Sequence, residues 1–118
     1  MITVRAVLDD EGCLRRLSVL GHASAAGGSP GTNVVCAAAT AIVRAVAEAI
    51  AARSTIAATG AAARPGELLV EIGQREPGDA EWLRGVADVL KTGIGRLAAE
   101  LPGEVEFVIT RRGEHHGS

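Results

Sequence analysis

Aromatic side chains are nearly missing from this sequence: they make up 2% of its 118 residues, with one Trp, one Phe and no Tyr. Surfaces that bind single-stranded nucleic acid stack bases on aromatic rings, so this class of protein is nearly excluded. Cations are not in surplus either, because 12 Lys and Arg stand against 14 Asp and Glu, a net charge of −2. Strong binding to nucleic-acid phosphates needs such a surplus. We therefore expect no direct nucleic-acid binding.

Cysteine is also scarce. The two thiols, Cys13 and Cys36, are too few for a disulfide scaffold or a zinc ribbon. Together with His22 and His115 or His116 they show no metal-ligand spacing. We therefore expect no metal site. We find no apolar run that approaches the ~20 residues needed to cross a bilayer, and no signal peptide at the N-terminus. These absences favour a cytoplasmic protein.

Alternating apolar residues predict strands, and apolar residues at a spacing of three and four predict helices. The expected strands are 2–8, 13–21, 54–62 (the weakest), 67–73 and 104–111, and the expected helices are 33–53 and 79–101. Asn33 and Asp79 are the expected N-caps. The order β-β-α-β-β-α-β predicts an α+β two-layer sandwich, with a mixed, mostly antiparallel sheet and both helices on one face. We expect one domain over 1–111 and a polar tail over 112–118.

Each helix shows an apolar row that we expect to face the core. In the first helix the row is Val34, Ala38, Ile42, Ala45, Ala49 and Ala52. In the second helix it is Trp82, Val86, Val89, Leu90, Ile94, Leu97 and Leu101. Three glycines in the second helix, Gly85, Gly93 and Gly95, suggest that the two helices pack closely.

Cys36 is the most informative position for chemistry. If Asn33 caps the helix, Cys36 falls in its first turn, where the partial positive charge of the helix stabilises a thiolate. The competing interpretation is a small core residue, since free cysteine is often buried. Thr40 lies one turn further along, on a row that continues to Arg44 and Glu48, which we expect to pair on a solvated face.

His22 ends the second strand at the mouth of a glycine-rich loop. A strand end and a helix start can lie side by side, so His22 could reach Cys36 as the base of a nucleophilic thiol; otherwise it is a surface histidine. The loop over Gly27, Gly28 and Gly31 could also hold an anion with its N–H groups. It lacks the Lys-Ser/Thr ending of a phosphate-binding loop, which weakens that alternative.

Two motifs together resemble the bacterial ribosomal-processing cysteine proteases. They are Gly21-His22-Ala23 and, after a short glycine-rich loop, Val34-Val35-Cys36-Ala37-Ala38. The predicted order of elements is also similar to the fold of that family over most of the chain. The sequence departs from the family pattern at Asn33, where the family has Asp, and at Thr40, where it has Ser.

The resemblance implies a cysteine endopeptidase with Cys36 as nucleophile and His22 as base, supported by Gly21, Asn33 and Thr40. It implies that Gly27, Gly28 and Gly31 belong to a loop that rearranges over the substrate. The implied substrate is large-subunit ribosomal protein twenty-seven, made with a short N-terminal extension and cut after a pair of aromatic residues. It also implies a homodimer and no cofactor. The rival functions are a non-catalytic ribosome-associated assembly factor and an anion-binding module.

Overall fold

The computed structural model describes residues 1–21, 30–61 and 67–112, and only the backbone of 30–33. Five strands and two helices follow one another in the predicted order. They are β1 (Ile2–Leu8), β2 (Leu14–Leu20), α1 (Pro30–Ala52), β3 (Ala58–Ala61), β4 (Leu68–Ile72), α2 (Asp79–Glu100) and β5 (Val105–Arg111). The α+β fold expected from the sequence is therefore confirmed.

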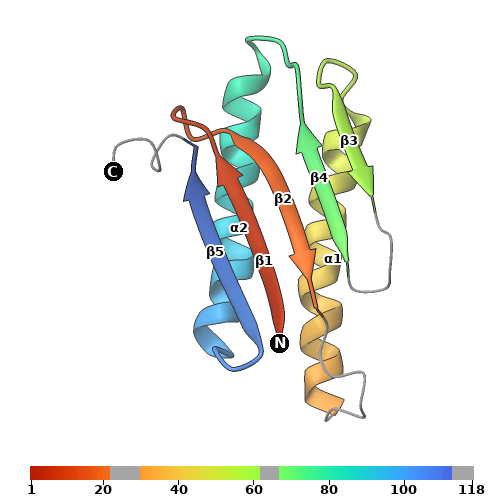
Figure 1. Ribbon diagram of the computed structural model, residues 1–118, viewed down its shortest axis with the longest axis vertical. Coiled ribbons are helices and arrows are strands. Elements are labelled where there is room, and N and C mark those ends of the chain that lie inside the picture. The colour runs from red at the N-terminus through yellow and green to blue at the C-terminus, as the bar shows by residue number, and fades with distance from the viewer. Residues whose placement is uncertain (22–29, 62–66, 113–118) are drawn as a thin grey trace.

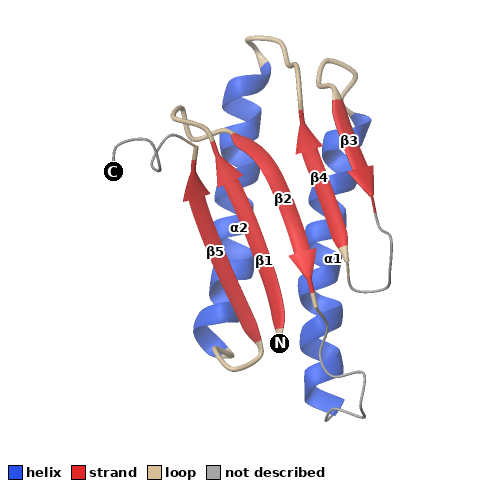
Figure 2. Cartoon of the chain, viewed as in Figure 1, coloured by secondary structure: helices blue, strands red, loops and turns tan. Residues whose placement is uncertain are grey.

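The strands form one mixed sheet in the order β3-β4-β2-β1-β5. β1 pairs with β5 in parallel, and the other three pairings are antiparallel. Both helices lie behind this sheet, as Figure 1 and Figure 2 show. The core lies between the two layers, and β3 and β5 are the edge strands.

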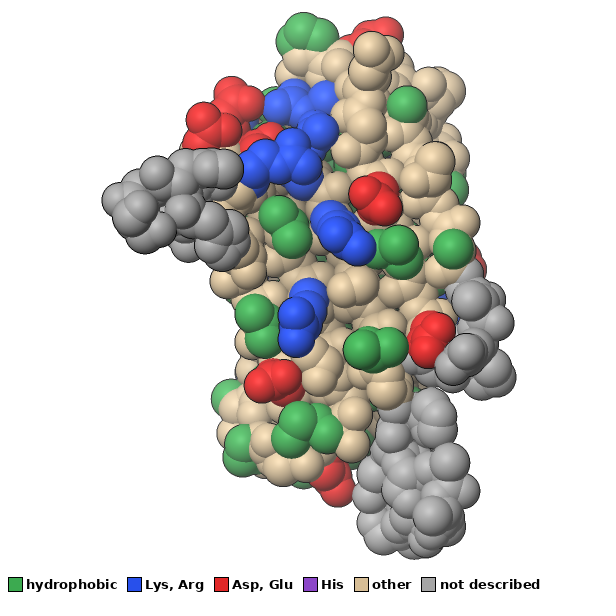
Figure 3. Space-filling view, viewed as in Figure 1, with side chains coloured by type: hydrophobic (Ala, Val, Ile, Leu, Met, Phe, Trp, Pro, Cys, Tyr) green, Lys and Arg blue, Asp and Glu red, His purple; other side chains and the backbone are tan. Residues whose placement is uncertain are grey.

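The uncovered face of the sheet carries charge. Arg5, Arg16 and Glu71 are exposed there, because alternate residues of a strand point to opposite faces. Figure 3 views this face, where basic side chains and scattered acidic ones are separated by small apolar patches. The predicted alternation in the second strand is correct, since Leu17 and Val19 are buried and Arg16 is exposed.

α1 buries a different row from the one that the sequence predicted. Its buried side chains are Val35, Ala39, Val43, Val46 and Ile50. Val34, at the head of the predicted row, is 67% exposed. Alanine occurs on both sides of this helix, so the apolar period alone does not single out one row. The core instead receives most of the bulky β-branched residues, which bury more apolar area than alanine does.

α2 also buries a different row from the one that the sequence predicted. Its buried side chains include Leu83, Ala87, Leu90 and Ile94, so only the last two of these belong to the predicted row. Trp82 and Val86 are half-buried and Val89 is 59% exposed. Of the three glycines, Gly93 alone lies against α1: a Cβ there would come within 3.3 Å of Ile42 Cδ1. Gly95 faces Phe107, and Gly85 has open space beside it.

The start of α2 also differs from the prediction. Gly78 occupies the N-cap and makes no side-chain capping bond, while Asp79 is the first helical residue. The Asp79 side chain is buried, where its carboxylate accepts hydrogen bonds from Arg53 and Thr55. Two partners from the segment that follows α1 thus replace the capping role that the sequence suggested for Asp79.

The expectation that no apolar run is long enough to cross a membrane is wrong. Within α1, the 19 residues Val34–Ala52 are long and apolar enough to do so, and 28% of this stretch is buried inside the structure. The stretch is this apolar because of its composition: between its β-branched residues, most positions of the helix are alanine. The buried row of α1 packs against the sheet.

Candidate active site

The first turn of α1 begins earlier than predicted. The helix starts at Pro30, so Asn33 is its fourth residue and not its N-cap, and Cys36 is its seventh. Proline suits a first helical position because it has no N–H to leave unpaired. The first three helical residues leave their N–H groups without a partner in the helix, and since Pro30 has none, those of Gly31 and Thr32 remain. Cys36 therefore lies in the second turn, beyond the part of the helix where the dipole acts most strongly.

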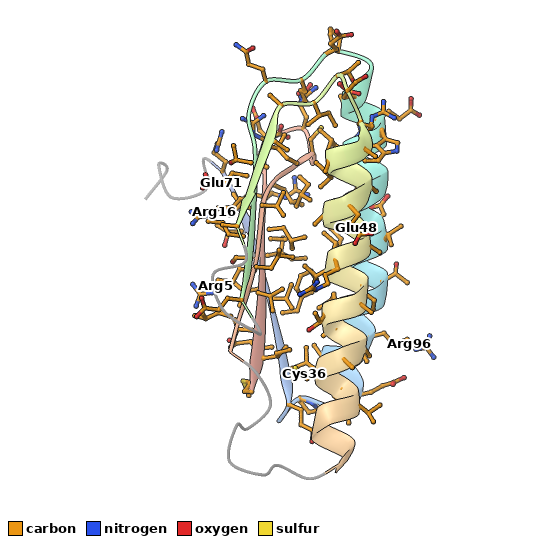
Figure 4. The ribbon with its side chains drawn as sticks, turned by 90° about the vertical axis from the view of Figure 1, so that its right-hand side faces the viewer. Arg5, Arg16, Cys36, Glu48, Glu71 and Arg96 are labelled. Carbon is orange, nitrogen blue, oxygen red and sulfur yellow. The ribbon has the colours of Figure 1, made fainter. Side chains whose placement is uncertain are left out.

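Cys36 itself lies at the rim of the core. It is half-buried and packs against the buried cluster. Figure 4 shows it on the side of α1 that faces the sheet, near the end of the molecule where α1 begins. β2 ends at the same end of the molecule (Figure 1). A side chain in this position is supported by the core and still reaches solvent, as a nucleophile must.

Thr40 lies one helical turn beyond Cys36. It is half-buried and lines a narrow hollow together with Val19 near the end of β2 and Leu68 at the start of β4. The turn of α1 that follows the thiol is therefore adjacent to the last residues of β2. This placement confirms that the end of the second strand and the start of the first helix are neighbours.

Gly21 follows β2 and has a structural reason to be glycine. Its φ is 85°, a conformation that other residues rarely adopt, and an added Cβ would lie 2.7 Å from the carbonyl oxygen of Met1. Gly21 thereby sets the direction in which the chain leaves β2. The candidate base His22 and the loop residues Gly27 and Gly28 lie outside the described residues. Gly31 and Asn33 belong to α1, where only the backbone is described.

The predicted ion pair on the outer side of α1 does not form. Among the residues that the structure describes, no salt bridge joins Arg44 and Glu48, and both are exposed. Two exposed side chains at this spacing gain little from pairing, because water screens their charges. Within the part of the chain that the structure describes, both charges are therefore unpaired.

The second cysteine is placed quite differently. Cys13 is fully buried, and its thiol donates a hydrogen bond to the carbonyl oxygen of Ala80, with 3.2 Å between Sγ and oxygen. Burial, and after it the negative charge of Asp9, raises the pKa of this thiol. A neutral thiol held in this way is a packing residue.

Asp9, Glu11 and Cys13 offer ligand atoms within 4.8 Å of one another. Arg75 already lies against them, with its Nη2 3.0 Å from Glu11 Oε2 and 3.8 Å from Asp9 Oδ2. One oxygen of Asp9 also accepts hydrogen bonds from the N–H groups of Glu11 and Cys13. These contacts fix the β1–β2 turn, so we interpret the cluster as structural.

One feature of the site was missed at the level of sequence. A hollow of about 320 Å³ opens between α1 and β3, and it is lined mainly by alanine and glycine. The sequence feature that could have indicated this hollow is the run of small residues at 58–61, which predicts only a weak strand. Whether such a strand lies against an alanine-rich helix depends on the tertiary structure.

Comparison with known proteins places the whole chain in context. The family model described as cysteine protease Prp matches residues 1–106. A crystal structure of SMU.848 from Streptococcus mutans is 21% identical, with a TM-score of 0.72 over 95% of this chain and 96% of that one. The essential ribosomal processing protease Prp from S. aureus, in complex with a covalently linked product peptide, is 20% identical, with a TM-score of 0.73 over 93% of this chain and 100% of that one. A comparison with the curated proteins finds no match.

Proposed function

Because this chain belongs to the Prp family of cysteine proteases, we propose that it removes the N-terminal extension of a ribosomal-protein precursor, using Cys36 and His22. The implied precursor is large-subunit ribosomal protein twenty-seven, and the reaction takes place in the cytoplasm. The observation that carries the proposal is the contrast between the two thiols. Cys36 is half-buried at the rim of the core, whereas Cys13 is buried with its S–H bonded.

The proposed chemistry is acyl transfer to sulfur. His22 accepts the proton of Cys36, and the sulfur attacks the scissile carbonyl carbon to form a tetrahedral oxyanion. The C–N bond then breaks, and His22 returns the proton to the leaving amine. Water hydrolyses the resulting thioester, which releases the extension and restores the thiol.

The start of α1 supplies donors for the oxyanion. The N–H groups of Gly31 and Thr32 are the ones that a helix beginning at Pro30 leaves free. They lie one turn before Cys36, so they are the nearest free backbone donors on the same helix. A tetrahedral oxyanion would be stabilised if the substrate carbonyl lay between this turn and the thiol.

The structural relatives support a peptide as the ligand. The S. aureus protease has been crystallised with a covalently linked product peptide and also with a substrate peptide. A covalent link to a product fits nucleophilic catalysis by a thiol. The present chain shares its fold with these relatives.

We also propose that the chain forms a homodimer through the outer side of its helices. An apolar groove of about 610 Å³ runs there between α1 and α2. Its large side chains are Ile42, Val46, Trp82, Val86 and Val89, and its small residues are Ala45, Ala49 and Gly85. A two-fold axis brings the same surface of both copies together, so that large side chains of one copy can fill the gaps beside small ones of the other. None of the residues that line the groove is charged.

A peptide that carries the aromatic-bearing extension tests the enzymatic proposal directly. The wild-type chain and the Cys13→Ala variant should cleave it, and iodoacetamide should abolish cleavage. In Cys36→Ala the rate should fall to less than about a thousandth, since the nucleophile is gone. Binding of the peptide without cleavage by the wild-type chain would instead favour a non-catalytic assembly factor.

A further inference from the structure

The hollow between α1 and β3 adjoins the candidate active site. On α1 the hollow is lined by Ala47, Glu48 and Ala51. The opposite wall is β3, with residues Ala58–Ala61, and β4 contributes Leu68 and Val70. We call it the α1–β3 hollow. Leu68 also lines the narrower hollow that contains Thr40, so the two spaces share a side chain. The α1–β3 hollow and the narrow hollow beside Thr40, one turn beyond the thiol, therefore adjoin at Leu68.

The distance from the thiol to the α1–β3 hollow is set by the helix. Cys36 and Glu48 are twelve positions apart on α1, which corresponds to about 18 Å along its axis. An extended chain advances about 3.3 Å per residue, so about five residues cover the same distance. Figure 4 looks onto this side of the molecule, with Cys36 near one end of α1 and Glu48 further along the same helix.

The chemistry of the hollow suits an apolar side chain with a cation beside it. Its lining is apolar except for Glu48 and Thr59, and small residues leave it open to solvent. Glu48 is exposed and makes no salt bridge with Arg44 within the described part of the chain. Among the described residues, this carboxylate at the margin of the hollow has no ion-pair partner, so it would attract a basic group.

The free side of β3 adds backbone donors and acceptors. β3 is the edge strand next to β4, and its residues Ala58–Ala61 are all exposed. It has only four residues, but it carries neither a charge nor a proline, two of the devices that protect an edge from pairing with another chain. An extended peptide that lies beside such an edge gains hydrogen bonds that do not depend on its sequence.

We propose that the α1–β3 hollow is a substrate subsite for an apolar residue about five positions before the scissile bond, with a basic group next to it at Glu48. This inference rests on the proposed function, because it takes the substrate to be a precursor with an N-terminal extension. The extension is a free chain and can lie along α1. The ribosomal protein that follows the scissile bond is too large for a hollow of about 320 Å³.

Two peptides test the subsite. The long one begins about seven residues before the scissile bond and carries an apolar residue at the fifth position with a lysine beside it; the short one begins about three residues before the bond. The wild-type chain should show a value of kcat/KM about tenfold higher for the long peptide, as expected when a single apolar side chain is buried. The Ala51→Phe variant, whose ring fills the hollow, should lose this advantage.

Matched variants make the test specific. Ala41→Phe places the same ring on an exposed position of α1 that lines neither hollow, and it should keep the preference for the long peptide. Glu48→Lys should weaken the preference by repelling the lysine of the peptide. The control Glu71→Lys reverses a charge on the uncovered face of the sheet (Figure 4) and should leave the preference unchanged.

Failure of this inference can be told apart from failure of the proposed function. Equal kcat/KM for the two peptides, or a preference that survives in Ala51→Phe, would overturn the subsite while leaving the protease intact. If the wild-type chain cleaves neither peptide, the proposed function fails. Fluorescence anisotropy with Cys36→Ala then still decides the inference, because the long peptide must bind more tightly than the short one and must lose this advantage when Ala51→Phe is added.

Discussion

Arg53, which follows the last residue of α1, and Asp79, the first residue of α2, form a partly buried ion pair that joins the two helix ends. Arg53 Nη2 and Nε lie 2.7 and 3.0 Å from Asp79 Oδ1. The carboxylate also accepts hydrogen bonds from the Thr55 hydroxyl and the N–H of Glu76. The Arg53 guanidinium lies over the ring of Trp82, with 4.5 Å between Cζ and the ring centroid. Because Trp82 lines the apolar groove between α1 and α2, the ion pair at the helix ends is in contact with that groove.

The Arg53–Asp79 pair predicts a loss of stability in acid. The Thr55 hydroxyl, and then Arg53, lower the pKa of Asp79, while burial opposes them. A carboxyl group whose pKa is lower in the folded state stabilises the fold above its unfolded pKa of about 3.9, and this contribution is lost as the pH falls through the folded value. Thermal unfolding from pH 7 to pH 2 should show a lower midpoint for Asp79→Asn at neutral pH and a smaller difference in acid.

Glu100→Gln is the matched control for this experiment. Glu100 pairs with Arg96 on the exposed side of α2, where an ion pair contributes little. Its substitution should leave the unfolding midpoint almost unchanged at every pH. A constant difference between wild type and Asp79→Asn down to pH 2 would show that the carboxylate charge of Asp79 is not what stabilises the helix ends.

The two thiols should differ in their reactivity. Iodoacetamide should label Cys36 in the folded protein well before Cys13, because Cys13 is buried and its pKa is raised by burial and by Asp9. Mass spectrometry after proteolysis identifies the labelled peptide, and in urea both thiols should react. Preferential labelling of Cys13 in the folded chain would contradict the placement of both residues.

Thr40 should act on the reaction through its hydroxyl. It is half-buried one turn beyond Cys36, where a hydroxyl can hydrogen-bond to a group beside the thiol. We expect Thr40→Ser to retain most of kcat and Thr40→Val, which has nearly the same shape, to lower kcat by about tenfold, the cost of a hydrogen bond. Equal activity of the two variants would reduce Thr40 to a packing residue.

The outer helical groove should hold the dimer together. Light scattering at micromolar concentration should give a mass of twice the 12.0 kDa of one chain. Val89→Glu places a charge on an exposed member of the groove and should reduce the mass to that of a single chain, because an unpaired charge is costly to bury. Glu106→Gln, at an exposed position of β5, serves as the control. A wild-type mass near 12.0 kDa would refute the proposed dimer.

The buried row of α1 can be tested by truncation. Ile50 is fully buried, so Ile50→Ala should lower the free energy of unfolding by about 2–5 kcal/mol. Val34 is 67% exposed, and Val34→Ala should change it by less than about 0.5 kcal/mol. Urea unfolding followed by circular dichroism measures both. A larger loss of unfolding free energy in Val34→Ala than in Ile50→Ala would show that α1 buries the row that the sequence predicted.

Much of this protein was predictable from local patterns. Alternation marked β1 from Ile2 to Leu8, and the sharp turns marked the ends of most elements, because strands, helices and turns depend largely on neighbouring residues. The order of the elements then predicted a two-layer fold. Cys36 could be distinguished from Cys13 in the same way, since it alone lies near the start of a helix.

The tertiary structure decided what local patterns left open. α1 has apolar residues on several sides, so only packing against the sheet selected the row that contains Val43. Asp79 was expected to cap its own helix, but Arg53 lies 26 positions earlier in the sequence and reaches it only in the folded chain. The α1–β3 hollow depends on how α1, β3 and β4 pack, because residues of all three elements line it. Contacts between distant residues depend on how whole elements pack together, and no local pattern in the sequence records that arrangement.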